Sequence, residues 1–414
     1  MRYEESIYLT EIEKRLLCLS KFVKEVTVKK REAEVIAFIY PDFQALKEQK
    51  IVNIENEIRW YAVELYNLDP IDDIKLDGYR IVQEPFSLAI EKEERNKASI
   101  SEPKDEMYQQ IKSYLQGVTA QPILPTSHLE LDLKLDSLDY VMLFAFVEKS
   151  FAVYMDEALF AERMVMQDFC RYIAQKQQKS DIHRVSWSEF IEEPVEYALA
   201  YSPLWMTFYK TFFLPLFKLY FRLDISGEEN LPESPCIIAP SHQSMLDGFI
   251  LAASLPYAVL KRSFFLAYEG EFGKSFMRPV ARNGQLIMIN TNRNLKTSMQ
   301  RTAVPLKEGE NIIIFPEGAR SRDAKLLPFK RYYAILAKEL NLPIVPVLLD
   351  GTFEAMKAGK LFPRPAEVRV EYLSPVYPDE LSYEEINGRV KSAIAEAMQK
   401  HPLRHIEGAS SEEE

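Results

Sequence analysis

Residues 236–254 read CIIAPSHQSMLDGFILAAS, in which two apolar segments flank a polar turn. The first segment, residues 236–239, is short and apolar like a buried strand, and the second, residues 248–254, is typical of a helix. The same alternation recurs downstream, with strands predicted at residues 286–289, 311–315 and 344–349 and helices at residues 295–304 and 332–340. Strands that alternate with helices predict an α/β layer structure from residue 224 onward.

The polar turn carries one histidine and one aspartate, His242 and Asp247, which lie five residues apart. A histidine titrates near neutral pH and can take a proton from an alcohol. On one ideal helix, five residues turn about 500°, which would separate the two side chains. They can meet if His242 lies in the turn before the helix and Asp247 lies in its first turns, where the carboxylate would hold the imidazole tautomer. The spacing alone often occurs by chance. The alternative is therefore a histidine that caps a buried helix and has no catalytic role.

A second polar segment, FPEGARSR at residues 315–322, overlaps the end of the strand predicted at residues 311–315. Arg320 offers a planar fork of hydrogen-bond donors, and Gly318 lets backbone N–H groups approach a ligand closely. We therefore predict a phosphate-binding loop, in which Glu317 orients Arg320 or meets an acceptor hydroxyl. A surface loop with a local ion pair is the alternative.

These two segments, followed by PIVPV at residues 343–347, resemble the glycerol-3-phosphate and lysophosphatidate acyltransferase family over about residues 225–375. The resemblance implies transfer of an acyl group from a CoA or carrier thioester to the free hydroxyl of a lysophospholipid, 1-acyl-sn-glycerol 3-phosphate first among them, without a metal. It assigns His242 as the base and Asp247 as its partner. The residues that it assigns to the acceptor phosphate are Glu317, Gly318, Arg320 and, from a basic motif with unusual spacing, Arg293. Ala319 and Tyr332 stand where the family often has Thr and Gly, and the tyrosine is expected to narrow the acyl tunnel.

Residues 107–176 form a separate block that contains LKLDSLDYV at residues 133–141. Asp136 and Ser137 stand where a helix is predicted to begin, and an aspartate there can cap free N–H groups. One face of that helix is apolar and consists of Leu138, Val141, Met142 and Ala145. The block resembles an acyl carrier domain, a four-helix bundle, which implies 4′-phosphopantetheine on Ser137. Lys134 departs from the Gly that is frequent in that family, and a serine that only begins a helix in a docking bundle is the alternative.

Residues 1–90 are predicted to form a small α+β unit. SIYLTEIEKRLL, FVKEVTVKK and VQEPF resemble the C-terminal subdomain of the acyl-adenylate-forming ligases. The matched residues do not include the large N-terminal subdomain of that family, and the family's Gly and adenylation lysine are matched by Ile90 and Glu91, with Lys92 one residue late. We therefore expect that this unit cannot activate a fatty acid alone, and that it is a docking unit, a relic, or half of a split ligase beside a separate adenylating protein.

The most apolar stretch of the chain, residues 198–221, is long enough to cross a bilayer. Lys210 and Lys218 lie inside it, however, and Pro203 and Pro215 are expected to break it. We expect one or two helices that lie on or dip into the cytoplasmic face of a membrane, so that the protein is peripheral or monotopic. A buried helical hairpin and a full span are the alternatives.

Composition narrows the remaining possibilities. The net charge of −11 argues against a nucleic-acid partner, and three distant cysteines give neither a disulfide framework nor a zinc spacing. We expect a multidomain chain with a small α+β unit at residues 1–90, a four-helix carrier bundle at 107–176, and an α/β acyltransferase domain with N-terminal membrane-associated helices at 190–400. Two other functions stay open, namely acylation of an aminolipid or a glycolipid and a carrier and docking role with an inert acyltransferase block.

Overall fold

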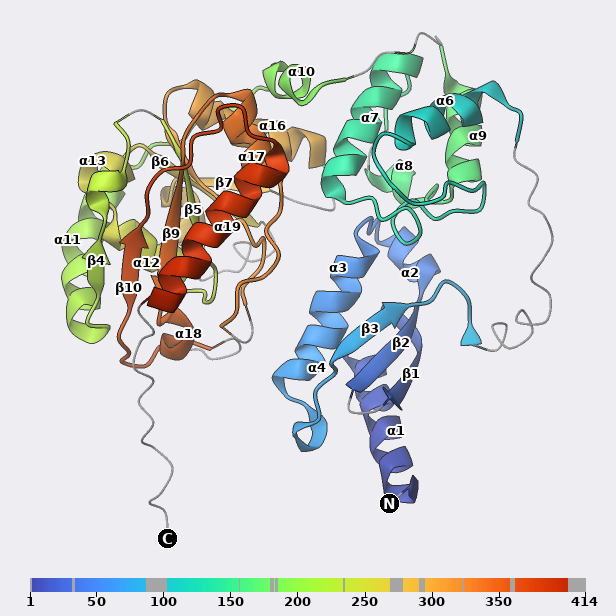
Figure 1. Ribbon diagram of the computed structural model, residues 1–414, viewed down its shortest axis with the longest axis horizontal. Coiled ribbons are helices and arrows are strands. Elements are labelled where there is room, and N and C mark those ends of the chain that lie inside the picture. Colours follow the sequence, from blue (N-terminus) through green and yellow to red (C-terminus); the bar gives the residue numbers. More distant parts are fainter. Residues whose placement is uncertain are drawn as a thin grey trace. The chain divides into compact units, whose positions relative to one another are not determined.

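The computed structural model describes residues 2–31, 34–86, 103–155, 157–178, 182, 185–233, 235–268, 278–289, 295–321, 324–357 and 362–400 (Figure 1). The chain divides into two compact units. The first unit comprises residues 1–186 with 291–296, and the second comprises residues 187–290 with 297–414. Both N-terminal blocks expected from the sequence lie in the first unit.

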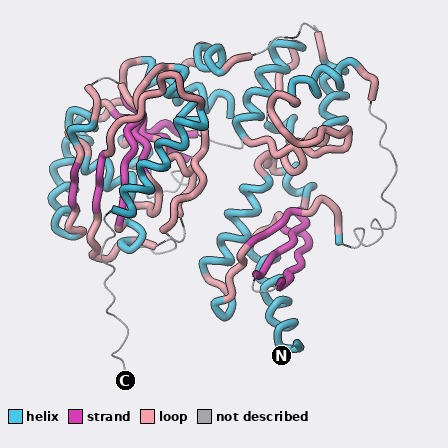
Figure 2. Tube along the Cα trace, viewed as in Figure 1, coloured by secondary structure: helices cyan, strands magenta, loops and turns pink. Residues whose placement is uncertain are grey.

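The N-terminal part of the first unit combines helices with a three-stranded sheet (Figure 2). Its strands are β1 (Val23–Arg31), β2 (Glu34–Pro41) and β3 (Gly78–Ile81). Its α-helices are α1 (Arg2–Leu19), α2 (Phe43–Glu48), α3 (Ile54–Ile58) and α4 (Glu64–Leu68), with a π-helical turn at Arg59–Val63. Strands β1 and β2 are antiparallel, whereas β3 runs parallel to β2. Every second residue of β2, from Val35 on, is buried, so one face of this sheet packs on a core.

The second part of the first unit is helical, with α6 (Glu106–Leu115), α7 (Ser137–Phe151), α8 (Glu157–Ala161) and α9 (Met166–Lys176). Aromatic side chains fill its interior, where Phe146 stacks on Tyr114 with ring centroids 4.1 Å apart. Asp136 caps α7, because its side chain accepts hydrogen bonds from Leu138 N (2.8 Å) and Asp139 N (3.1 Å). Helix α7 therefore begins at Ser137, where the sequence predicted a helix start.

A buried carboxylate joins the two parts of the first unit. Glu130 Oε2 accepts a hydrogen bond from Ile54 N (3.0 Å), and Glu130 Oε1 accepts one from Glu55 N (2.8 Å). These donors are free N–H groups of the first turn of α3, which carries the positive end of the helix dipole. Burial nevertheless raises the pKa of Glu130 to about 7, more than the two hydrogen bonds lower it.

A seven-stranded sheet forms the middle of the second unit, in the order β4-β10-β9-β5-β8-β6-β7. Its strands are β4 (Asp224–Ser226), β5 (Ile237–Pro240), β6 (Ser263–Tyr268), β7 (Leu286–Ile289), β8 (Asn311–Ile313), β9 (Ile344–Asp350) and β10 (Arg369–Tyr372). The five strands from β9 to β7 are parallel, whereas β10 runs antiparallel to β9 and pairs parallel with β4. The predicted α/β layer structure is confirmed.

Helices cover both faces of this sheet. They are α10 (Trp187–Glu192), α11 (Pro203–Tyr220), α12 (Asp247–Ser254), α13 (Tyr257–Leu260), α15 (Arg278–Asn283), α16 (Leu295–Lys307), α17 (Tyr332–Glu339), α18 (Thr352–Ala355) and α19 (Tyr383–Lys400). Val345, Val347 and Leu349 of β9 share a core with α11 and α12. The alternate residues of β9 face the other side of the sheet, where α17 and α19 pack.

Helix α11 occupies most of the apolar stretch at residues 198–221. Pro203 is its first residue, a position that suits proline, and Pro215 lies inside the helix without ending it. The stretch is therefore helical only from Pro203 on, as expected, but the expectation that Pro215 breaks it is wrong, because a helix packed on the domain can tolerate one lost backbone hydrogen bond. Among the residues that the structure describes, none of the helices is long and apolar enough to cross a membrane.

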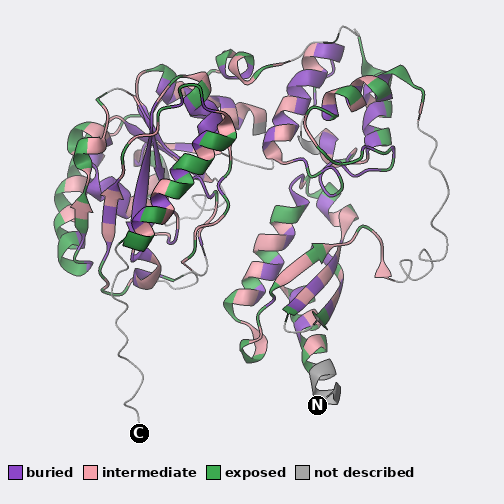
Figure 3. Cartoon of the chain, in the orientation of Figure 1, coloured by how far each residue is buried: buried purple, intermediate pink, exposed green. Residues whose placement is uncertain are grey.

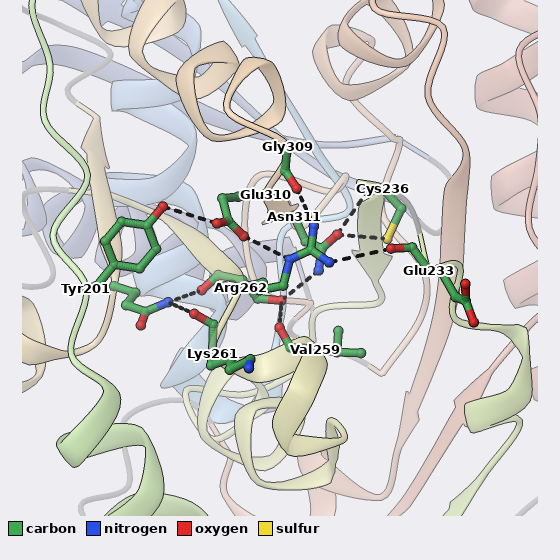
Figure 4. Close-up of polar contacts among 11 residues, drawn as sticks. Tyr201, Glu233, Cys236, Val259, Lys261, Arg262, Gly309, Glu310 and Asn311 are labelled. Atoms are coloured by element: carbon green, nitrogen blue, oxygen red, sulfur yellow. Dashed lines mark hydrogen bonds and ion pairs between the residues drawn. The ribbon is translucent and has the colours of Figure 1, made fainter.

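A polar network closes the amino ends of the parallel strands (Figure 4). Arg262, just before β6, donates through Nε to Glu310 Oε2 at 3.2 Å, and Tyr201 Oη donates to Glu310 Oε1 at 3.2 Å. Asn311, the first residue of β8, accepts a hydrogen bond from Cys236 N at 3.1 Å. These hydrogen bonds connect the amino ends of the strands. The loops that carry His242 and Glu317 lie at the opposite edge of the sheet, at the carboxyl ends.

We predict that Glu130→Gln removes part of the pH dependence of the first unit's stability. A carboxyl whose pKa rises from 4.5 to about 7 on folding binds its proton more tightly in the folded chain. The stability that this proton provides is fully present below the lower pKa and is lost as pH rises through the higher one, a change of roughly 3 kcal/mol. Chemical denaturation at about pH 5 and pH 8 measures it.

In that experiment the wild type loses stability relative to Glu130→Gln as pH rises. Glu162→Gln is the matched control, because the Glu162 side chain is 45% exposed, and it keeps the wild-type pH dependence. A parallel pH dependence in the wild type and Glu130→Gln would contradict the prediction.

Candidate active site

The site is built at the carboxyl ends of two neighbouring parallel strands. Strand β5 ends at Pro240 and leads into Ser241 and His242, while β8 leads into the segment that contains Glu317. Because β5 and β8 are parallel, the two loops emerge at the same edge of the sheet, the usual place for a site in α/β proteins. Ser321 N donates to His242 O at 2.8 Å, so the loops are also hydrogen-bonded to each other.

His242 and Asp247 are in direct contact. His242 Nδ1 lies 2.8 Å from Asp247 Oδ2. His242 precedes α12, and Asp247 is the first residue of that helix, which is the arrangement the sequence required for the two side chains to meet. A carboxylate only accepts hydrogen bonds, so Nδ1 carries a proton and Nε2 remains to take one from a substrate.

The backbone around Asp247 fixes this carboxylate in place. Asp247 is fully buried, and the same Oδ2 atom accepts from Gln243 N (2.6 Å) and Ser244 N (2.8 Å). Three donors thus compensate the buried charge, which costs free energy when it is unpaired. The turn between His242 and α12 therefore winds around Asp247, and the imidazole is held from its Nδ1 side.

His242 itself remains accessible, because 20% of its side chain is exposed. The ring of Phe315 lies against it, with ring centroids 4.1 Å apart and planes at 30°. The aromatic contact limits rotation of the imidazole, so its free edge keeps one direction. Sequence reasoning gave Phe315 no role, since a phenylalanine at a strand end is ordinary.

Glu317 is buried between the two loops. Its Oε1 accepts from His242 N (2.8 Å) and its Oε2 accepts from Leu327 N (2.7 Å). Burial raises the pKa of Glu317 to about 7, although both hydrogen bonds lower it. Both carboxylate oxygens already have backbone partners, so this geometry suits a residue that positions His242 better than one that contacts an acceptor.

The loop after Glu317 contains the glycine and the arginine that the sequence assigned to phosphate binding. Gly318 has a φ of +66°, a conformation that glycine adopts without strain. Arg320 follows in the same loop and is half-buried. Arg293, assigned from the basic motif, lies outside the described residues. Within the described ranges, no three His, Cys, Asp or Glu side chains come together as metal ligands.

Comparison with known proteins agrees with this geometry. Residues 222–350, which include both loops, match the family described as Acyltransferase. A 1-acyl-sn-glycerol-3-phosphate acyltransferase of Cocos nucifera is 30% identical over 172 residues, which cover 41% of this chain and 54% of that protein. The protein of that name from Pseudomonas aeruginosa is 29% identical over 191 residues, 43% of this chain and 69% of its own.

Among solved structures, the acyltransferase PlsC of Thermotoga maritima is similar, with 24% identity, a TM-score of 0.41, and coverage of 48% of this chain and 81% of that chain. The chain spans 54–59% of the length of three of the curated relatives it matches, from Cocos nucifera, Limnanthes douglasii and Limnanthes alba. The matches to these plant relatives cover 41% of the present chain.

We predict that Glu317→Gln in the acyltransferase domain lowers kcat while the KM for the acceptor stays within about twofold. A glutamine can accept one of the two backbone hydrogen bonds but not both, so the His242 loop shifts, and a misplacement of about 1 Å can cost roughly 10²-fold in rate. Steady-state kinetics with a lysophospholipid acceptor measure the change.

The control for that experiment is Glu308→Gln, because Glu308 is exposed on the same domain, and its kcat stays at the wild-type value. A raised acceptor KM with an unchanged kcat in Glu317→Gln would instead make Glu317 a substrate-binding residue.

Proposed function

We propose that the acyltransferase domain transfers a fatty acyl group from a thioester to the free hydroxyl of 1-acyl-sn-glycerol 3-phosphate, in phospholipid synthesis. The observation that carries the proposal is the 2.8 Å contact between His242 Nδ1 and Asp247 Oδ2 at the carboxyl edge of the sheet. The names of the relatives, which are 1-acyl-sn-glycerol-3-phosphate acyltransferases, support the choice of acceptor.

The proposed mechanism needs no nucleophile from the protein. His242 Nε2 takes the proton of the acceptor hydroxyl as its oxygen attacks the thioester carbonyl. Asp247 stabilises the imidazolium through Nδ1, as the carboxylate does in a serine-type triad. The tetrahedral intermediate collapses, the carbon–sulfur bond breaks, and the imidazolium returns its proton to the leaving thiolate. The products are the acylated lipid and the free thiol of CoA or of a carrier.

The acceptor phosphate is proposed to bind in the loop that contains Gly318 and Arg320. The positive φ of Gly318 supports this, because it turns the chain just before Arg320, while Gly318 N itself donates to Phe315 O at 3.1 Å. Arg320 supplies charge and paired donors. Glu317 is proposed to act through the position of this loop and of His242, since backbone N–H groups occupy both of its oxygens.

The domain is proposed to work at a membrane surface, on the cytoplasmic face, without spanning it. An exposed apolar stripe on α11 supports the membrane-surface location. Its side chains are Leu204, Phe208, Phe212, Leu216 and Leu219. Leu204 is 86% exposed and Leu219 is 82% exposed, values that water alone does not favour for leucine. Much of the outer side of α11 is coloured as exposed in Figure 3. Lipid is the occupant that fits, because the acceptor is itself a lipid that must reach His242 from a bilayer.

The helical part of the first unit is proposed to be an acyl carrier with 4′-phosphopantetheine on Ser137. Ser137 is the first residue of α7 and is half-exposed, while the capping box is completed by its neighbours Asp136 and Asp139. The serine hydroxyl has no hydrogen-bond partner among the described residues. When bound, the arm would supply a thiol for the acyl group, and a tethered donor reaches an effective concentration of about millimolar.

The N-terminal part of the first unit is proposed to hold this carrier rather than to activate fatty acids. The Glu130 hydrogen bonds to α3 support a docking role. A second contact adds to them, because Gln83 Nε2 donates to Asp132 Oδ1 at 2.6 Å. Loading of the arm would then fall to a separate acyl-adenylating ligase.

We predict that the purified chain prefers acceptors with a phosphate monoester. A panel of 1-acyl-sn-glycerol 3-phosphate, monoacylglycerol, an aminolipid and a glycolipid, each with acyl-CoA and with acyl carrier donors, measures kcat/KM. Hydrogen bonds to a charged group contribute about 1.5–3 kcal/mol, so the phosphate acceptor should exceed monoacylglycerol by at least about tenfold.

Arg320→Lys should lower that preference by raising the acceptor KM, because lysine lacks the planar fork. Arg389→Lys, at an exposed position of α19, serves as the control and leaves the preference unchanged. Equal use of a phosphate-free acceptor would contradict the assigned substrate, and no transfer to any acceptor would leave only the carrier and docking role.

We predict that Ser137 is modified when the chain is co-expressed with a phosphopantetheinyl transferase. Intact-mass spectrometry should show an added mass of one phosphopantetheine, absent from Ser137→Ala and retained in Ser113→Ala, whose serine is exposed on α6. An unmodified wild type under these conditions would reduce the helical part to a docking bundle.

A further inference from the structure

Lys210 lies within the apolar helix α11 but does not turn its charge to solvent. Its Nζ donates to Ala253 O at 2.7 Å and to Ser254 O at 3.3 Å, and also to Leu255 O. These are the carbonyls at the end of α12, which have no partner inside the helix and carry the negative end of its dipole. The amine of Lys210 is partly withdrawn from water, and this burial lowers its pKa.

Two further hydrogen bonds fasten α11 on the same side. Tyr209 Oη donates to Phe249 O at 2.8 Å, in the first turn of α12. Thr207 Oγ1 lies 2.8 Å from Tyr257 Oη, at the start of α13. Tyr209 and Lys210 thus hold one side of α11 against the helix that begins with Asp247, while Thr207 holds it against α13, and buried Met206 and Phe217 add apolar packing.

The apolar stripe defined above lies on a different side of α11. Leu204, Phe208, Phe212 and Leu216 are spaced four residues apart, so they share one face of the helix. Helix α11 therefore has an exposed apolar face on one side, and on another side three side chains that hydrogen-bond to α12 and α13. Helix α12 in turn has Asp247 at its first turn and Lys210 against its last carbonyls, so opposite charges complement both ends of its dipole.

We propose that Lys210 is a positioning residue that couples the lipid-facing helix to the catalytic helix, so that His242 keeps a fixed place relative to the surface of the bilayer. The inference rests on the proposed function, since it assumes that α11 meets lipid and that His242 acts on a lipid acceptor. Lys218, two turns further along α11, is exposed and makes no contact with the end of α12 among the described residues. It provides a matched lysine in the same helix.

The test compares Lys210→Met, which keeps the aliphatic stem but loses all donors, with Lys210→Arg and Lys218→Met. Two quantities are measured on the full chain: cosedimentation with phosphatidylcholine and phosphatidylglycerol vesicles, and the ratio of kcat/KM for a long-chain acceptor in those vesicles to kcat/KM for a short-chain, water-soluble 1-acyl-glycerol 3-phosphate.

For Lys210→Met we expect vesicle binding within about twofold of the wild type and a ratio lowered at least about tenfold. Lys210→Arg should restore most of the ratio, and Lys218→Met should leave it unchanged. Equal losses for both acceptors would reduce Lys210 to a structural residue. Lost vesicle binding with an unchanged kcat at saturating vesicles would make it a headgroup contact. Either result overturns the proposal.

Failure of the proposed function is distinct, because the wild type would then acylate neither acceptor. If Lys210→Met does not fold, as judged by circular dichroism, Tyr209→Phe replaces it. That variant removes only the hydroxyl bonded to Phe249 O, so the ratio should fall in the same direction, and an unchanged ratio overturns the proposal.

Discussion

The buried carboxylate of Asp247 is the constraint on which the geometry of the second unit depends. A charge with no exposed surface needs hydrogen-bond donors, and Asp247 Oδ2 finds three of them in the five residues before it. One of the three is His242 Nδ1, so the requirement that satisfies the aspartate also orients the histidine. The strand β5, the turn and α12 are arranged so that this short segment can close on itself.

Two other buried carboxylates join segments that are distant in the sequence. Glu317 binds the backbone of His242 across 75 residues, and Glu130 binds the backbone of Ile54 across 76 residues. In each case both oxygens accept backbone N–H groups, and burial raises the pKa to about 7. Each of these two connections therefore depends on the protonation of one carboxyl group whose pKa lies near neutral pH.

Local patterns in the sequence predicted much of this fold, whereas distant contacts were beyond them. Strand β7 coincides with the predicted residues 286–289, because a short apolar run is a strong signal. Strand β10, which reads RVEY, was not predicted, since two of its four residues are charged. The His242–Asp247 contact followed from spacing, but the clamp by Lys210 reaches Ala253 across 43 residues and leaves no local trace. From the sequence alone, Lys210 is only a charge that argues against a membrane span.

The most direct measurement is the rate of acyl transfer to 1-acyl-sn-glycerol 3-phosphate by His242→Ala and Asp247→Asn, each with its fold verified by circular dichroism. Loss of a general base costs about 10²–10⁴-fold in rate, so the kcat of His242→Ala should fall by at least about 100-fold. Asp247→Asn should fall substantially as well, because a neutral amide lacks the negative charge that stabilises the imidazolium through Nδ1. A folded His242→Ala variant with a turnover within about threefold of the wild type would contradict the role of His242 as the base.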